Sequence, residues 1–221
     1  TSANSINFAR LFPQSFFYFN ALAQLGKTHK PVVISVPSGN FGNLTSGLIA
    51  KKMGLPVHQF IAATNSNHSV PDYLKNGIYQ PQQTSHTITN AMDVGDPSNF
   101  PRLTEIYQKQ HPDIAADIQG YWFTDDHTRS AMAEIQNQYN YQCDPHGAVA
   151  YAGIKKSGLM KENVCIFLET AHPAKFPDEV EKSTKLKINI PEALQKIVKM
   201  EKKSTRISNN YESLLAEIYK L

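Results

Sequence analysis

The residues best suited to chemistry form the run Ser38-Gly39-Asn40-Phe41-Gly42-Asn43, between an apolar stretch and a helical stretch. Glycines permit positive φ values and close approach of the backbone to a ligand, so consecutive N–H groups can point at an anion. The positive end of the following helix would add to that attraction. The run matches neither GxxxxGK[ST] nor GxGxxG. It therefore indicates either a phosphate-binding loop of another kind or a tight structural turn.

Thr170, directly after the apolar run 164–168, is the second candidate. Its hydroxyl can give or accept one hydrogen bond, which suits a heterocyclic nitrogen. Ligands of open α/β sheets bind at the carboxyl ends of the strands, where both Thr170 and the loop 38–43 are expected to lie. The alternative is a threonine that merely closes a turn.

A third group, Ser5, Asn7 and Arg10, stands at the start of the first helical pattern. Serine and asparagine in this place usually cap a helix. The guanidinium of Arg10 has a fixed fork of donors that suits a phosphate or a carboxylate, although an arginine on an exposed helix face is the commoner case.

The histidines and cysteines predict no metal site. No HxxxH pair and no cluster with carboxylates at metal-ligand spacing occurs among the eight histidines, and the two cysteines lack CxxC spacing. His146 and His172 stand apart because each lies beside a proline, at the predicted end of a strand or helix. No GxSxG elbow is present, so hydrolase chemistry is not favoured.

The elements that must position these residues follow an α/β pattern. Apolar runs predict strands at 32–36, 57–63, 121–124 and 164–168. Helical patterns cover 7–25, with Pro13 in its first turns or at a kink, and 44–53, 103–110, 125–139 and 145–156. Polar residues from 65 to 101 predict long loops with short elements. Alternating strands and helices predict an open, mostly parallel sheet flanked by helices.

Length and composition predict one substantial domain with a helical appendage. The 221 residues are 41% hydrophobic and 19% charged, and residues 177–221 are charged and helical, so we expect a domain at 1–176 and an extension at 177–221. The net charge of +3 is spread along the chain, which gives no sign of nucleic-acid binding. No apolar window of membrane length and no signal peptide is found, so a cytoplasmic location is expected. Because the chain lacks an initiator Met, we expect a fragment or a processed product.

Three segments, in this order, resemble the threonine synthase family: Ser2-Ala-Asn-Ser-Ile-Asn7 with Arg10, Ser35-Val-Pro-Ser-Gly-Asn-Phe-Gly-Asn43, and Thr170-Ala-His-Pro-Ala-Lys-Phe176. Segments 61–65, 90–94 and 144–146 are similar to the same family. The resemblance covers residues 1 to about 176 and corresponds to a C-terminal part. It implies one half of a fold-type II pyridoxal-phosphate enzyme, a carbon–oxygen lyase acting on phosphates. That enzyme converts O-phosphohomoserine and water into threonine and phosphate.

The resemblance also implies a role for each candidate residue. Ser38, Gly39, Asn40, Phe41, Gly42 and Asn43 would bind the phosphate of pyridoxal 5'-phosphate, and Thr170 its pyridine nitrogen. Ser5, Asn7 and Arg10 would bind the substrate phosphate. The family's Schiff-base lysine lies upstream, in a Phe-Lys-Asp context that does not occur here, and Lys175 belongs to a different motif. No catalytic residue is therefore assigned to this chain, which is expected to be inactive, and to bind the cofactor weakly or not at all, without the missing N-terminal part of the enzyme.

Two alternatives remain open at this point. Another fold-type II enzyme, such as a serine or threonine dehydratase or a cysteine synthase, would share the glycine loop and the sheet but would not need the group from Ser5 to Arg10. A non-catalytic module could instead hold a phosphorylated metabolite through the loop alone.

Overall fold

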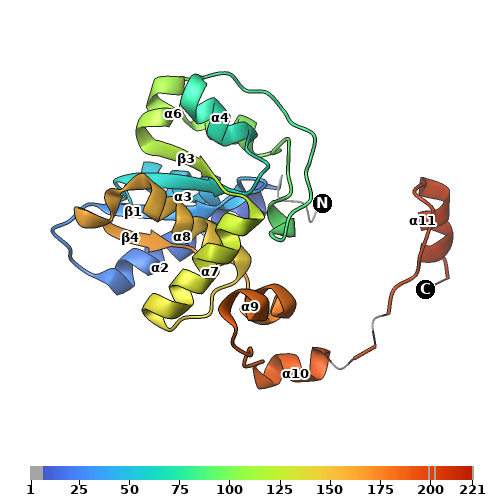
Figure 1. Ribbon diagram of the computed structural model, residues 1–221. Helices are drawn as coiled ribbons and strands as arrows, with labels where there is room; N and C mark the ends of the chain where they lie inside the picture. Colours follow the sequence, from blue (N-terminus) through green and yellow to red (C-terminus); the bar gives the residue numbers. More distant parts are fainter. Residues whose placement is uncertain (1–6, 199, 202, 221) are drawn as a thin grey trace. The chain divides into compact units, whose positions relative to one another are not determined.

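The structure, a computed structural model, describes residues 7–198, 200–201 and 203–220 (Figure 1). The chain divides into two compact units, the first ending at Ile188 and the second starting at Asn189. The boundary predicted after Phe176 stays a prediction of where the cofactor-binding domain ends. The candidate site residues up to Thr170 all belong to the first unit.

A four-stranded parallel sheet forms the centre of the first unit, in the order β3-β2-β1-β4. Its strands are β1 (Val32–Pro37), β2 (Gln59–Thr64), β3 (Ile118–Trp122) and β4 (Val164–Phe167). The open parallel sheet predicted from the sequence is thus confirmed. β3 begins three residues before its predicted start, because Ile118 is already paired with Phe60 and Thr124 instead caps the next helix.

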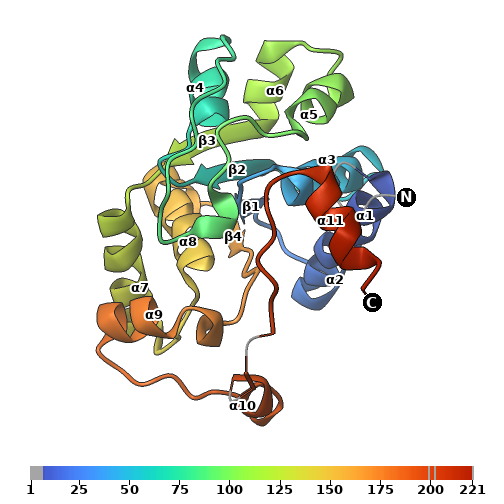
Figure 2. The same ribbon diagram turned by 90° about the vertical axis from the view of Figure 1, so that its right-hand side faces the viewer.

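One face of the sheet is covered by α2 (Ser15–Leu25) and α3 (Gly42–Lys52) (Figure 2). Alternate residues of β1 point to this side, and Ile34 packs there in one apolar cluster with Tyr18 and Leu48. The same cluster extends to three helices near β3, α4 (Ser69–Asn76), α5 (Phe100–Ile106) and α6 (His111–Asp117). The core on this side therefore supports the helix that follows the glycine loop.

The other face carries α8 (Pro145–Ser157), with α7 (Asp125–Tyr139) and α9 (Pro177–Thr184) beyond it. The hydroxyl of Ser35 in β1 donates to the carbonyl of Ala150 at 2.7 Å. A Cβ on Gly153 would lie 3.0–3.1 Å from Ile61, Ala63 and Ser35, so this glycine lets α8 lie close to the strands. Asp144 caps α8 and Pro145 is its first residue, so the helix begins where the pattern at 145–156 predicted.

The helix predicted at 7–25 is broken near its start. It consists of α1 (Phe8–Leu11), a 3-10 turn η1 (Phe12–Gln14) and α2. Pro13 lies inside the 3-10 turn, which confirms its predicted effect, and Gly26 ends α2 with a φ of 70°. The break allows α1 to contact α3 through its own last residue, Leu11.

The remaining elements of the first unit are short. They are η2 (Asn90–Met92), η3 (Leu159–Lys161) and η4 (Pro173–Lys175). The second unit contains α10 (Glu192–Val198) and α11 (Tyr211–Ile218), the latter capped by the Asn210 side chain, which accepts the N–H of Ser213 at 2.8 Å. The helical character predicted for this charged region is thus confirmed.

Candidate functional site

Two of the predicted site segments lie at the same edge of the sheet, where the parallel strands end. Ser35 of β1 is level with Phe167 of β4, and the N–H of Leu168 donates to the Ser35 carbonyl at 3.0 Å. Ser38 and Thr170 each follow that matched pair by the same number of residues. The loop after β1 and the threonine after β4 are therefore neighbours in the fold, as their positions after the two strands predicted.

Backbone N–H groups between β1 and α3 can donate hydrogen bonds to an anion. The Ser38 N–H is engaged, since it donates to the Ala63 carbonyl at 2.8 Å. In the part of the chain that the structure describes, five N–H groups beyond it have no acceptor, those of Gly39, Phe41, Gly42, Asn43 and Leu44. The last three begin the 11-residue helix α3, whose dipole favours negative charge at this end. This row of unpaired donors fits a phosphate group.

The positive φ angle in the loop belongs to Phe41 and to neither of its glycines. Phe41 has φ 60° and ψ 11° at the N-cap position of α3, whereas Gly39 and Gly42 have no positive φ. A non-glycine residue in this region costs about 1–3 kcal/mol. The ring of Phe41 is 4% exposed and belongs to the core cluster, so burial of the ring holds the strained turn in place.

Asn40 and Asn43 hold the loop at its two flanks. The Oδ1 atom of Asn40 accepts the N–H of Ser98 at 2.6 Å and its hydroxyl at 3.0 Å. The buried hydroxyl of Tyr18 donates to the Asn43 carbonyl at 2.9 Å and also contacts the Asn43 Oδ1 atom. Both side chains therefore position the backbone donors.

Gly39 lies directly against the short turn η2. A Cβ at this position would stand 2.6 Å from the Met92 Cα atom and 2.9 Å from the Ala91 carbonyl oxygen. Real Cβ atoms do not come so close to backbone, so a glycine is required here. Gly39 therefore allows the loop to pack against a neighbouring segment of the chain, and close approach of its backbone to a ligand stays a prediction.

A buried polar network holds the segment that carries η2. The side-chain amide of Asn65, which follows β2, donates to Thr87 at 2.8 Å and to Asp93 Oδ1 at 2.9 Å. The Thr87 hydroxyl donates to the same Asp93 oxygen at 2.7 Å. The sequence showed only that residues 65–101 are polar. Their role as a network that braces η2 depends on the pairings of Asn65, which lies more than twenty residues from both Thr87 and Asp93.

Thr170 borders a cavity of about 330 Å³, within the size range of ligand sites. The cavity reaches η2 through Asn90 and Ala91, and η2 in turn contacts Gly39. The Thr170 hydroxyl forms no hydrogen bond with any other described residue. The hydroxyl is thus available to a ligand at the edge of the sheet where the unpaired N–H groups also lie.

A cluster of ionisable side chains beside Thr170 was not predicted. The Nδ1 atom of His146 lies 2.6 Å from Asp144 Oδ1, and both side chains are buried. The Asp144 N–H donates to Glu169 Oε1 at 2.6 Å. Burial raises the pKa of Glu169 to about 7, and the nearby Asp144 carboxylate adds to this rise while its N–H opposes it. The available signal was the segment Asp144-Pro145-His146, whose similarity to the threonine synthase family assigned no role to these side chains.

The raised pKa of Glu169 predicts a pH-dependent stability. The folded protein binds the proton of this carboxyl more tightly than the unfolded chain, whose carboxyl keeps the ordinary value near 4.5. The stabilisation is complete below pH 4.5 and is lost as the pH rises through about 7. We therefore expect Glu169→Gln, which keeps an oxygen acceptor for the Asp144 N–H, to remove this part of the pH dependence.

The measurement is urea unfolding of both proteins from pH 4.5 to pH 8. The difference in unfolding free energy between variant and parent should shift in favour of the variant across this range. A difference that stays constant with pH would show that Glu169 titrates near its ordinary value in the folded chain.

The predicted substrate-binding group is only partly described. Ser5 lies outside the described residues. Asn7 caps α1, with its Oδ1 atom accepting the Ala9 N–H at 3.0 Å, and Arg10 is exposed on the same helix. The Ser46 hydroxyl joins the carbonyls of Leu11 at 2.7 Å and Gly42 at 3.0 Å. The end of α1 is therefore next to the first turn of α3, which carries the unpaired N–H groups.

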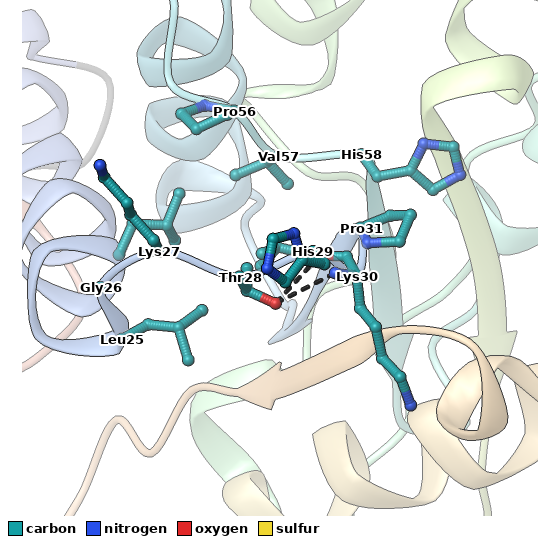
Figure 3. A pocket seen from close by; sticks show the side chains of 12 residues that line it. Leu25, Gly26, Lys27, Thr28, His29, Lys30, Pro31, Pro56, Val57 and His58 are labelled. Carbon is teal, nitrogen blue, oxygen red and sulfur yellow. Dashed lines mark hydrogen bonds between the residues drawn. The ribbon is translucent and has the colours of Figure 1, made fainter.

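A larger hollow, of about 820 Å³, lies at the opposite edge of the sheet, where β1 begins (Figure 3). Its wall includes Val57 and His29, and the Lys30 side chain points away from both and bonds to the Lys161 carbonyl at 3.2 Å. The Thr28 hydroxyl accepts the Lys30 N–H at 3.1 Å. Ligands of parallel sheets bind at the other edge, so this hollow is not the candidate site.

The described residues contain neither a cluster of metal ligands nor a membrane-spanning helix. No group of three or more His, Cys, Asp or Glu side chains among them could hold a metal ion. No helix in that part of the chain is long and apolar enough to cross a bilayer.

Comparisons with known proteins agree with this geometry. The sequence model of pyridoxal-phosphate-dependent enzymes matches residues 12–170, and the model of the threonine synthase C-terminal region matches residues 147–218. Threonine synthase from Haemophilus influenzae is 44% identical over 220 residues, which is 99% of this chain and 51% of that protein. Similarity thus continues beyond Phe176, where the resemblance read from the sequence ended.

Solved structures show the same relation. The crystal structure of threonine synthase from Escherichia coli has a TM-score of 0.90 and 39% identity, covering all of this chain and 51% of that one. A pyridoxal-phosphate-bound threonine synthase from Brucella melitensis has a TM-score of 0.87 and 29% identity, with 99% and 52% coverage. The chain spans about half the length of the relatives it matches.

Proposed function

Because this chain belongs to the family of pyridoxal-phosphate-dependent enzymes, we propose that it forms the cofactor-phosphate-binding part of a threonine synthase. The row of unpaired N–H groups at the start of α3, at the same sheet edge as Thr170, is the observation that carries this proposal. A doubly charged phosphate ester is stabilised by such donors and by the helix dipole. Similarity to threonine synthase along 220 residues favours this enzyme over other members of the family.

In this proposal the chain orients the cofactor from two sides. The loop of Ser38, Gly39, Asn40, Phe41, Gly42 and Asn43 holds the cofactor phosphate, mainly through backbone N–H groups. The Thr170 hydroxyl bonds the pyridine nitrogen. When bound, pyridoxal phosphate supplies an electron sink for negative charge on the carbons of the substrate. Asn40 and Asn43 keep the donors aligned through their contacts with Ser98 and Tyr18.

The proposed reaction converts O-phosphohomoserine and water into threonine and phosphate. Arg10 is proposed to bind the substrate phosphate together with Asn7 and Ser5. It directly precedes Leu11, whose carbonyl accepts the Ser46 hydroxyl near the start of α3. A guanidinium is suited to this task because it can donate two parallel hydrogen bonds to phosphate oxygens.

The isolated chain is proposed to be inactive. It contains no Phe-Lys-Asp segment, and we propose that the Schiff-base lysine belongs to the other half of the enzyme. That half would also close the open side of the cofactor pocket. We therefore expect no turnover by the chain alone.

The test is an assay of the longer enzyme, of which this chain would be a part, with O-phosphohomoserine, serine and threonine in turn. Phosphate and threonine should be released only from O-phosphohomoserine, and Arg10→Ala should raise the KM for it by roughly tenfold to a hundredfold. Lys27→Ala removes a cation at the opposite edge of the sheet and should leave KM unchanged. Ammonia release from serine or threonine alone would assign the enzyme to the dehydratases.

A further inference from the structure

The histidine in the wall of the Thr170 cavity has an unused nitrogen. His146 is 3% exposed, and its Nε2 atom has no hydrogen-bond partner among the described residues. A buried polar atom without a partner is unfavourable and rare. The Nε2 atom therefore indicates a partner outside the described residues, and a bound ligand is one that the adjoining cavity can hold.

The rest of the imidazole is fixed, so it cannot turn to satisfy Nε2 elsewhere. Its Nδ1 atom lies 2.6 Å from the carboxylate of Asp144, which is fully buried. The same carboxylate accepts the His146 N–H at 2.8 Å. The ring of Phe176 packs beside the imidazole, with the ring centres 5.0 Å apart.

The contact with Asp144 also determines the chemistry of Nε2. A carboxylate accepts hydrogen bonds, so the proton of a neutral imidazole belongs on Nδ1. The Nε2 atom then carries a lone pair and accepts a hydrogen bond. For the neutral imidazole, the missing partner of Nε2 is thus a donor, an N–H or an O–H group.

The residues that line the cavity indicate which ligand contains this donor. His146 forms a buried part of its lining, whereas Asn90, Thr170 and Lys175 on the same lining are exposed. The lining residue Ala91 belongs to η2, which packs against Gly39 of the glycine loop. A ligand with its phosphate in the loop and its ring nitrogen at Thr170 presents its ring to this cavity.

We infer that His146 is a second residue that contacts the cofactor ring, with Nε2 accepting a hydrogen bond from the ring hydroxyl. Asp144 is the residue that positions it. The inference rests on the proposed function, because it requires a pyridine ring beside Thr170. It assigns a role to a histidine for which the sequence gave none.

Two substitutions separate the two nitrogens of His146. His146→Asn keeps an amide close to the Nδ1 position, where it can still donate to Asp144, and removes the group at Nε2. His146→Gln places an amide close to the Nε2 position. Each is made in the cofactor-free form of the longer enzyme, and His172→Asn serves as the matched control. His172 is exposed, and its side chain caps η4, a task that asparagine also performs.

The probes are inorganic phosphate, which fills only the loop, and pyridoxine 5'-phosphate, which adds the ring but cannot react with a lysine. Dissociation constants for both are measured by equilibrium dialysis. His146→Asn should weaken binding of pyridoxine 5'-phosphate roughly five- to tenfold with no change for phosphate, and His146→Gln should recover part of the loss. His172→Asn should change neither constant. An analogue without the ring hydroxyl identifies the donor, since its affinity would become insensitive to His146→Asn if the hydroxyl is that donor.

Two outcomes would overturn these assignments, and they are distinguishable. Equal weakening of both probes by His146→Asn, or no weakening of either, would show that His146 only supports the fold, and the proposed function would stand. Pyridoxine 5'-phosphate binding to the unmodified protein no more tightly than phosphate would instead contradict the cofactor site itself, and the inference with it.

Discussion

Gly39→Ala is expected to displace the glycine loop and to weaken phosphate and pyridoxine 5'-phosphate binding by at least about tenfold. The added Cβ would lie 2.6 Å from the Met92 Cα atom and 2.9 Å from the Ala91 carbonyl oxygen. These are backbone atoms that cannot rotate away, so the loop or η2 must move. Hydrogen bonds to a charged ligand depend on alignment and contribute about 1.5–3 kcal/mol each, so displacement of one or two donors accounts for this loss.

The same substitution should also lower stability. Forcing extra volume into a packed site costs about 1–3 kcal/mol, and 2 kcal/mol corresponds to roughly 4–8 °C in Tm for a chain of this size. Thermal unfolding followed by circular dichroism measures this change, and equilibrium dialysis measures the binding.

Gly158→Ala provides a control of similar cost without a binding effect. Gly158 has a φ of 72° at the end of α8, and its added Cβ would meet no atom within 4 Å. The strain of that backbone should cost about 1 kcal/mol and leave both dissociation constants unchanged. If Gly39→Ala bound both probes as tightly as the parent, the loop would not be the phosphate site.

The strands that form the centre of the sheet could be predicted because their apolar residues are continuous. Runs at 32–36 and 164–168 became β1 and β4 almost unchanged, and the helix between the first two strands identified a parallel pair. β3 was misplaced because Phe123 extends the apolar run Tyr121-Trp122 past the end of the strand. The N–H of Phe123 does bond to the Thr64 carbonyl at 3.0 Å, but the chain turns into the cap of α7 directly afterwards.

Two helices could be identified only by weak signals. α4 begins with Ser69 and has Pro71 in its first turn, and Gly77 ends it in the left-handed conformation. α6 has Pro112 in its first turn in the same way. Both are seven or eight residues long, too short for a periodic pattern to stand out among polar neighbours. Packing against the sheet, which the sequence does not show, stabilises them.

The candidate site was predictable in place but not in its supports. Because the loop and Thr170 each directly follow a strand, both were predicted to lie at the same edge of the sheet. The register of β1 and β4 confirms this. The contacts that hold the loop link Asn40 to Ser98 and Asn43 to Tyr18, pairs far apart in the sequence. His146 was noticed for its neighbouring proline, yet its buried, unpaired Nε2 atom depends on three segments meeting around it. The burial of an unpaired atom is a result of tertiary packing, so no local sequence pattern predicts it.

Asp144→Ala is expected to have the largest effect on stability, about 3–5 kcal/mol, or roughly 6–20 °C in Tm. The carboxylate of Asp144 is fully buried and accepts the N–H of His146 at 2.8 Å as well as its Nδ1–H at 2.6 Å. Alanine would leave these two donors buried without an acceptor, in addition to removing the cap of α8. A lost cap alone costs about 1 kcal/mol, and each buried unsatisfied group adds about 1–3 kcal/mol.

Two comparison variants distinguish the buried network from an ordinary cap. Thr124→Ala removes the cap of α7, a more exposed site where the Thr124 hydroxyl accepts the His127 N–H at 3.4 Å. This change should lower the free energy of unfolding by only about 1 kcal/mol. Asp144→Asn keeps an oxygen for the His146 donors and should fall between the two, because the amide no longer provides a charge-assisted bond. Urea unfolding at pH 8 gives the three values. The cap by itself accounts for a loss of about 1 kcal/mol. If the unfolding free energy of Asp144→Ala lay within about 1 kcal/mol of the parent value, the histidine would be held by packing against Phe176 rather than by the carboxylate.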